Sequence, residues 1–122
     1  EVISAYTRAQ ALEDGVLVDV SAVAREAGIT FPVALTRSVW GHYVEVPAGV
    51  IGQDEAGRLW DVVWMLRHAI RGARDGQDTI LSRLHVRNDN RERTPPLVTL
   101  KSICGPGDEG EPVITVCMPD ED

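Results

Sequence analysis

Cysteine, lysine and aromatic residues are scarce in this chain of 122 residues, and long apolar runs are missing. The sequence holds two cysteines, three tryptophans, two tyrosines and one phenylalanine, and Lys101 is the only lysine. No apolar run approaches the roughly 20 residues that a membrane-spanning helix needs. The first ten residues, EVISAYTRAQ, lack a basic start followed by an apolar stretch. We therefore expect no membrane partner, no secretory signal and a cytoplasmic protein.

Signatures of catalysis and metal binding are missing too. His42, His68 and His85 are scattered, and the C-x-x-C and H-E-x-x-H spacings do not occur. We therefore expect no metal and no cofactor. Cys104 and Cys117 leave a disulfide and two thiols both open, and the lack of an export signal favours thiols. Neither thiol has a local sequence cue for a cysteine–histidine nucleophile, so we predict that the chain is not an enzyme.

One stretch matches the dinucleotide-binding pattern G-x-G-x-x-G letter for letter, from Gly105 to Gly110. A dinucleotide loop must lead into a helix whose amino terminus faces the pyrophosphate. Here the following residues, 111–118, have the alternation of a strand, and Asp108 and Glu109 would repel phosphate. The pattern therefore indicates the turn of a β-hairpin and no nucleotide site.

Acidic residues outnumber basic ones by 19 to 12, which gives a net charge of −7. This excess disfavours a general binder of nucleic acid or of anionic membranes, because repulsion opposes encounter. The charge is also uneven. Basic residues dominate from Arg67 to Lys101, whereas every charged residue from Ser102 to Asp122 is an acid. The acidic end can fold back on the basic middle, meet a partner, or simply be solvated.

The length and a hydrophobic content of 43% predict one folded domain over residues 1–122. Helical periodicity and capping residues predict a long helix over 54–74 and shorter helices over 8–14, 22–28 and 30–43. Alternation predicts strands over 16–20, 79–86, 97–104 and 112–118, the last two forming a C-terminal β-hairpin. If this hairpin pairs Cys104 with Val113 across its loop, Cys117 lies opposite Leu100, too far along the ladder for a disulfide with Cys104. We expect an α+β fold in which an antiparallel sheet of three or more strands packs against the long helix and two or three shorter helices.

The long helix carries two stripes. Its apolar residues recur at steps of three and four, which is typical of a helix face turned to a core (Leu59, Val62, Val63, Leu66, Ala69, Ile70 and Ala73). Beside that face lie Trp60, Trp64, Arg67 and Arg71. Tryptophan and arginine are enriched in interface hot spots, so this stripe is a candidate partner-binding surface. The alternative, that the first helices cover the tryptophan side, stays open.

Several segments resemble a family of small bacterial proteins of unknown function carried on plasmids and other mobile or accessory DNA. The resembling stretches are ISAYTRAQALEDGVLVDVS, AREAGITFPVALTRSVW, GRLWDVVWM and LVTLKSICGPGDEGEPVITVCMPDED. The resemblance covers most of the chain and implies a cytoplasmic accessory protein. Proteins of this size and acidity on mobile DNA often inhibit host defence, so it also implies an anti-CRISPR or anti-restriction role.

The leading hypothesis is a non-enzymatic acidic protein that binds a protein partner, such as a nucleic-acid-binding defence complex, without contacting nucleic acid itself. The acidic hairpin and tail would compete with nucleic acid for a basic groove, and an aromatic–arginine anchor would supply affinity. The alternative is a small homodimeric regulatory or structural module, and an enzyme comes third. The candidate partner-binding residues are Trp60, Trp64, Arg67, Arg71, Asp108, Glu109 and Glu111.

Overall fold

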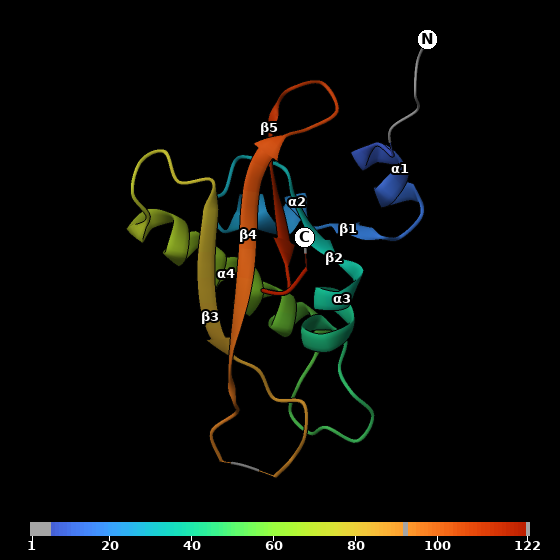
Figure 1. Ribbon diagram of the computed structural model, residues 1–122. Helices are drawn as coiled ribbons and strands as arrows, with labels where there is room; N and C mark the ends of the chain where they lie inside the picture. The colour runs from blue at the N-terminus through green and yellow to red at the C-terminus, as the bar shows by residue number, and fades with distance from the viewer. Residues whose placement is uncertain (1–5, 92, 122) are drawn as a thin grey trace.

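The structure, a computed structural model, describes residues 6–91 and 93–121 and has a five-stranded sheet at its centre (Figure 1). The strand order is β1-β2-β5-β4-β3. The strands are β1 (Leu17–Asp19), β2 (Val33–Thr36), β3 (Thr79–His85), β4 (Leu97–Pro106) and β5 (Pro112–Cys117). The helices are α1 (Arg8–Glu13), α2 (Ser21–Glu26), α3 (Arg37–Val39), the π-helical turn η1 (Trp40–Val44) and α4 (Glu55–Gly72). This arrangement confirms the α+β class and the C-terminal hairpin of β4 and β5.

The sheet is mixed, so the prediction of an antiparallel sheet is wrong at one pair. Strand β2 runs parallel to β5, with Val33 opposite Ile114 and Leu35 opposite Val116, while the other pairs are antiparallel. The predicted helix over 30–43 is wrong for the same reason, because its first part is β2. Pairing with a distant strand outweighed the four-residue spacing of apolar residues, and the β-branched Val33 suits a strand. The helical part begins only at Arg37.

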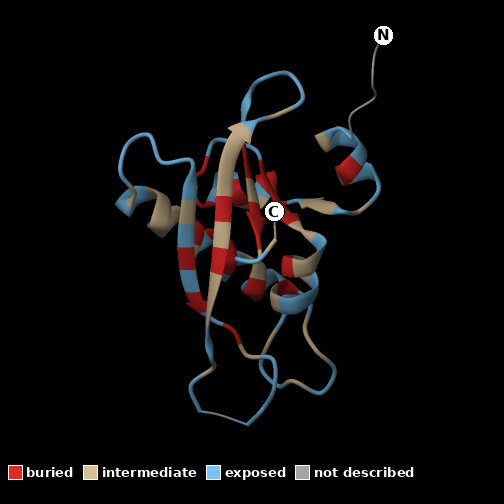
Figure 2. Ribbon diagram, in the orientation of Figure 1, coloured by how far each residue is buried: buried red, intermediate tan, exposed pale blue. Residues whose placement is uncertain are grey.

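Helix α4 crosses behind the sheet and supplies most of the second layer (Figure 1). Its observed bounds lie within two residues of the predicted 54–74 at each end. Asp54 caps the helix, because its Oδ1 accepts a hydrogen bond from the Gly57 N–H at 2.6 Å. Val62, Val63 and Leu66 are at most 1% exposed and pack against the sheet with α2, as the apolar stripe predicts. Figure 2 shows the buried residues concentrated where the sheet and α4 overlap.

A buried arginine joins α4 to the loops at one end of the sheet. Arg58 is 4% exposed and donates hydrogen bonds to the carbonyls of Val44 (3.2 Å) and Arg87 and to Oδ1 of Asn88 (2.7 Å). It also reaches the His42 carbonyl at 3.4 Å. Burial lowers the pKa of Arg58. A buried guanidinium that is satisfied by carbonyls fixes η1, α4 and the loop after β3 relative to one another.

The hairpin of β4 and β5 differs from the predicted register by one residue. Cys104 lies opposite Ile114, where the prediction placed Val113, and Cys117 lies opposite Lys101. The two cysteines are therefore three ladder positions apart, about 10 Å along the strands, and on opposite faces of the sheet. This separation is too large for a disulfide between them.

Candidate protein-binding surface

The tryptophan–arginine stripe consists of Trp60, Trp64, Arg67 and Arg71. We call these four residues the outer face of α4. The rings of Trp60 and Trp64 stack with centroids 5.7 Å apart and an interplanar angle of 19°. The Arg67 Cζ sits 4.8 Å from the centroid of the Trp64 ring, within the range of a cation–π contact. The inner residues of α4 face the sheet, so this stripe points away from it. Three of the four side chains, all but that of Arg71, thus form a stacked surface that is ordered in advance.

Solvent reaches this outer face. Trp60 is 37% exposed and Trp64 is 42% exposed, and Arg71 is exposed as well. Helix α2 packs against α4 without covering the two tryptophans. Within the described ranges, Arg71 has no hydrogen bond or ion pair. The first helices therefore do not cover the tryptophan side, and Arg71 is available to a partner.

Two hollows flank the outer face. On one side a groove of about 380 Å³ runs between α4 and the edge strand β3, with Trp64 and Met65 on the helix and Arg83, His85 and Leu97 on the sheet. Asp61 also lines this groove, and partial burial raises the pKa of its carboxyl. On the other side a pocket of about 380 Å³ lies beneath Arg67 and Arg71. A partner on the outer face would therefore contact concave surfaces on both sides of Trp60 and Trp64, the pair that we call the tryptophan ridge.

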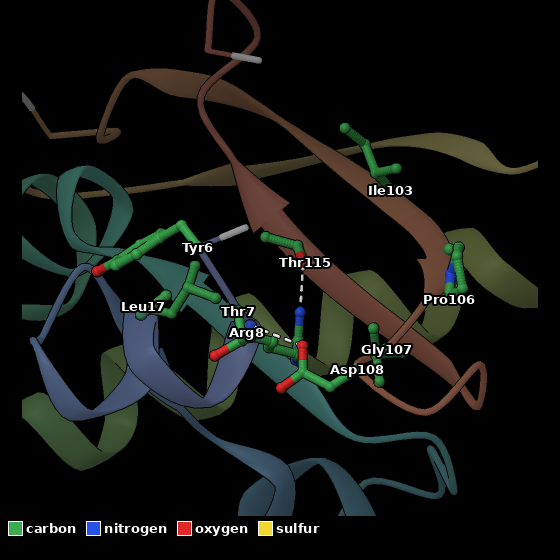
Figure 3. Close-up of a pocket in the computed structure, with 12 residues that line it drawn as sticks. Tyr6, Thr7, Arg8, Leu17, Ile103, Pro106, Gly107, Asp108 and Thr115 are labelled. Atoms are coloured by element: carbon green, nitrogen blue, oxygen red, sulfur yellow. Dashed lines mark hydrogen bonds between the residues drawn. The ribbon is translucent and has the colours of Figure 1, made fainter. Parts of the chain in front are cut away.

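The acidic hairpin is organised differently, because its Asp108 caps a helix of this same chain. One oxygen of Asp108 accepts a hydrogen bond from the backbone N–H of Arg8 at 2.8 Å (Figure 3). The other accepts one from the backbone N–H of Ala9 at 2.9 Å, and both donors lie at the amino terminus of α1. These bonds, the one from Ala9 first, lower the pKa of Asp108, and the charge of Arg8 adds to the effect. The Asp108 carboxylate is therefore engaged within the chain.

Arg8 holds α1 on the sheet from the other direction. Its guanidinium donates a hydrogen bond to Thr115 Oγ1 at 2.7 Å (Figure 3). It donates another to the Ile114 carbonyl at 3.0 Å, and both acceptors lie on β5. Desolvation lowers the pKa of Arg8, although Asp19 and other nearby carboxylates oppose the change. Thr7 completes a capping box with Gln10 at the amino terminus of α1. A groove of about 470 Å³ separates α1 from the hairpin.

Of the other two acids of the hairpin loop, Glu111 accepts a hydrogen bond from the loop backbone and Glu109 is exposed to solvent. Glu111 Oε1 accepts a hydrogen bond from the Glu109 N–H at 2.9 Å. A Cβ added at Gly107 would lie 2.5 Å from Glu111 Oε2, so the carboxylate fills the space beside that glycine. Glu109 is exposed. Strand β5 follows this loop, as predicted, where a dinucleotide site would need a helix.

The histidines do not gather. His42 Nδ1 lies 2.8 Å from the Ser38 carbonyl oxygen, and His85 Nδ1 lies 2.7 Å from that of Pro95. No three histidine, cysteine or carboxylate side chains in residues 6–91 and 93–121 are placed to hold a metal ion. In the same part of the chain, no helix has the length and apolar character needed to cross a membrane.

Sequence reasoning missed two arginines with structural roles, Arg8 and Arg58. A signal for Arg58 was present, because it precedes Val62 by four residues and so lies on the inner stripe of α4. Nothing in the sequence marks Arg8, whose partners on β5 lie more than 100 residues away. Asp120 and Glu121 of the acidic tail are described, whereas Asp122 lies outside the described residues. Glu121 Oε1 accepts hydrogen bonds from Thr36 Oγ1 and the Met118 N–H, so this carboxylate too is engaged.

The chain belongs to a family of unknown function (DUF6573), whose match extends over residues 1–122. This agrees with the expected resemblance to uncharacterised proteins. Neither the curated proteins nor the solved structures contain a match to the chain.

Proposed function

We propose that this protein works by binding a partner protein on the outer face of α4, without catalysis. The observation that carries the proposal is the stacked pair Trp60 and Trp64, with Arg67 over the second ring, on a helix face turned away from the core. Stacking and the cation–π contact hold these side chains in one arrangement before a partner arrives. Less side-chain entropy is then lost on binding.

The tryptophan ridge exposes apolar surface to water, which is unfavourable, and folding alone does not explain why these residues are tryptophans. Trp60 and Trp64 expose more than a third of their surface, although the core of α4 is complete without them. Exposed tryptophan beside arginine, with a hollow on each side, is the arrangement of an interface hot spot. A partner that covers the ridge removes this apolar surface from water, at about 25 cal/mol for each Å².

The charges favour a partner with carboxylates near an apolar anchor. Arg67 and Arg71 give the outer face positive charge, in contrast to the net charge of −7 of the whole chain. The hairpin contributes less, because Asp108 and Glu111 already accept hydrogen bonds within the chain. We therefore place the contact on the four residues of the outer face, and the competition of the acidic hairpin with nucleic acid stays a prediction.

The proposal is tested by partner capture from the native host with the purified chain as bait. Trp60→Ala combined with Trp64→Ala should remove a specific partner, because both anchors are gone. Leu81→Ala is the matched control, since Leu81 is 50% exposed and lies on the opposite face of the sheet. Retention of the partner by the double variant, with loss in the control, would contradict the proposal. Light scattering separates the homodimer alternative, in which the parent chain self-associates and the double variant is monomeric.

An anti-defence role in the cytoplasm is the finer form of this proposal, and its support is the expected link of the resembling family to mobile DNA. Cells with an active CRISPR or restriction system should accept a targeted plasmid more often when they express the chain. The Trp60→Ala, Trp64→Ala variant should lose this protection, whereas Leu81→Ala should keep it. No protection by the parent chain, together with specific capture of another protein, would remove the anti-defence role and leave the binding function.

A further inference from the structure

The pocket beneath Arg67 and Arg71 has the construction of a small-molecule site. It lies between the last turns of α4, the segment after α2 and the sheet, and its volume of about 380 Å³ lies within the range of ligand pockets. Ile70 of α4, Ile80 of β3 and Ile114 of β5 form apolar walls, and Cys104 of β4 joins them. The space between the helix layer and the sheet is therefore unfilled at this end, and its walls suit an apolar group.

Positive charge lines the same pocket. Arg67 and Arg71 lie one helical turn apart, and the Gln77 side chain also lines the site. None of the residues that line the pocket is an acid. Neither guanidinium has a carboxylate partner within the described ranges. An arginine side chain offers a planar set of donors that matches a carboxylate, so two of them beside an apolar pocket favour an anion.

Arg67 is held in place beside the pocket. Its guanidinium stacks on Trp64, and its Nε lies 3.2 Å from the position that a Cβ on Gly28 would occupy. Gly28 has φ of +96°, a conformation that favours glycine, at the end of α2. The bare backbone of Gly28 thus leaves room for the arginine. A donor positioned before binding loses less entropy when the ligand arrives.

We infer that this pocket binds a small amphipathic acid, with a carboxylate between Arg67 and Arg71 and an apolar chain against the isoleucines. The site shares Arg67 and Arg71 with the outer face, but it uses the space beneath them, so a ligand there leaves Trp60 and Trp64 exposed. Arg71 also lies in the last turn of α4, where a cation interacts favourably with the helix dipole. The test must therefore separate ligand binding from a role in helix stability.

Calorimetric titration of the full chain with a series from butanoate to octanoate tests the inference without any variant. Each added methylene should tighten binding about threefold to fourfold if the chain enters the apolar pocket. Octanol should bind at least tenfold more weakly than octanoate, because it lacks the charge that the arginines recognise. Methyl NMR should show shifts of Ile80 and Ile114 during the titration. Equal affinity for octanol and octanoate, or no dependence on chain length, would overturn the inference.

Variants then assign the charge. Arg71→Gln should weaken octanoate binding about tenfold or more, through loss of a charged hydrogen-bond donor. Arg74→Gln is the matched control, because Arg74 is exposed near the end of the same helix and does not line the pocket. A lower melting temperature for Arg71→Gln with unchanged octanoate affinity would mean that Arg71 serves only the helix dipole, and would overturn the site. Partner capture through the tryptophan ridge is a separate measurement, so failure here leaves the proposed function standing.

Discussion

The outer face of α4 and the loop between β4 and β5 both place charged side chains at the surface, but they use them differently. In the loop, Asp108 caps α1 and Glu111 accepts a hydrogen bond from the loop backbone. On α4, Arg67 contacts only the Trp64 ring among the interactions found in the described residues, and Arg71 contacts no hydrogen-bonding partner there. A charged surface residue is thus a better candidate for partner binding when it is not already hydrogen-bonded to backbone groups of its own chain.

The largest expected effect concerns the inner face of α4, which carries the folding energy that the outer face does not. Leu66→Ala should destabilise the protein by about 2–5 kcal/mol, because Leu66 is 1% exposed and its loss leaves a cavity. Urea unfolding followed by circular dichroism measures this change. The comparison fails if Trp64→Ala costs as much, because the outer face would then belong to the core.

The next effect comes from the buried arginine at the other end of α4. Arg58→Met should destabilise the fold by about 1–3 kcal/mol, since the buried Val44 carbonyl and the half-buried Arg87 carbonyl lose this donor. Hydrogen exchange should show faster exchange in η1 and in the loop after β3. Arg25→Met is the control, because Arg25 is an exposed residue of α2, and it should leave both stability and exchange unchanged. Equal unfolding curves for Arg58→Met and the parent would show that Arg58 does not hold η1, α4 and the loop after β3 together.

The hairpin side of the comparison is tested through α1. Asp108→Asn should increase amide exchange at Arg8 and Ala9 several-fold, because the charged acceptor at the helix amino terminus is lost. In the parent chain the folded-state pKa of Asp108 is lowered, so protection should hold above the ordinary value of 3.8 and disappear as the carboxylate protonates at lower pH. The variant should lack this pH dependence. Glu109→Gln is the control, and an equal loss of protection there would contradict the specific role of Asp108.

The sequence predicted α4 and its two faces well because eighteen residues with a steady helical period depend little on distant contacts. It failed at β2, where the four-residue spacing of Leu35 and Val39 imitates a helix while the parallel partner lies some 80 residues away. The hairpin register slipped by one because bonding between Gly107 and Glu111 sets the turn. The hydrogen bonds of the Asp108 and Glu121 carboxylates involve residues that are distant in sequence and meet only on folding, so no local pattern predicted them.

The smallest expected effect on stability belongs to the outer face. Arg71→Ala should change the free energy of unfolding by less than about 0.5 kcal/mol, because Arg71 is exposed and unbonded in the described ranges. The same substitution should weaken partner binding by about 1 kcal/mol or more if the residue belongs to a hot spot. Thermal melts beside a binding titration measure both. Unfolding as severe as that of Leu66→Ala would place the stripe inside the protein.

The most direct test titrates the captured partner against three chains: the parent, Asp108→Asn, and Trp60→Ala with Trp64→Ala. We predict that the tryptophan variant loses affinity by at least about 30-fold, the effect of removing hot-spot anchors worth 2 kcal/mol or more. Asp108→Asn should bind like the parent, because its carboxylate serves α1 and faces no partner. Unchanged affinity for the double tryptophan variant, together with loss of binding by Asp108→Asn, would contradict this prediction. The binding surface would then lie on the hairpin.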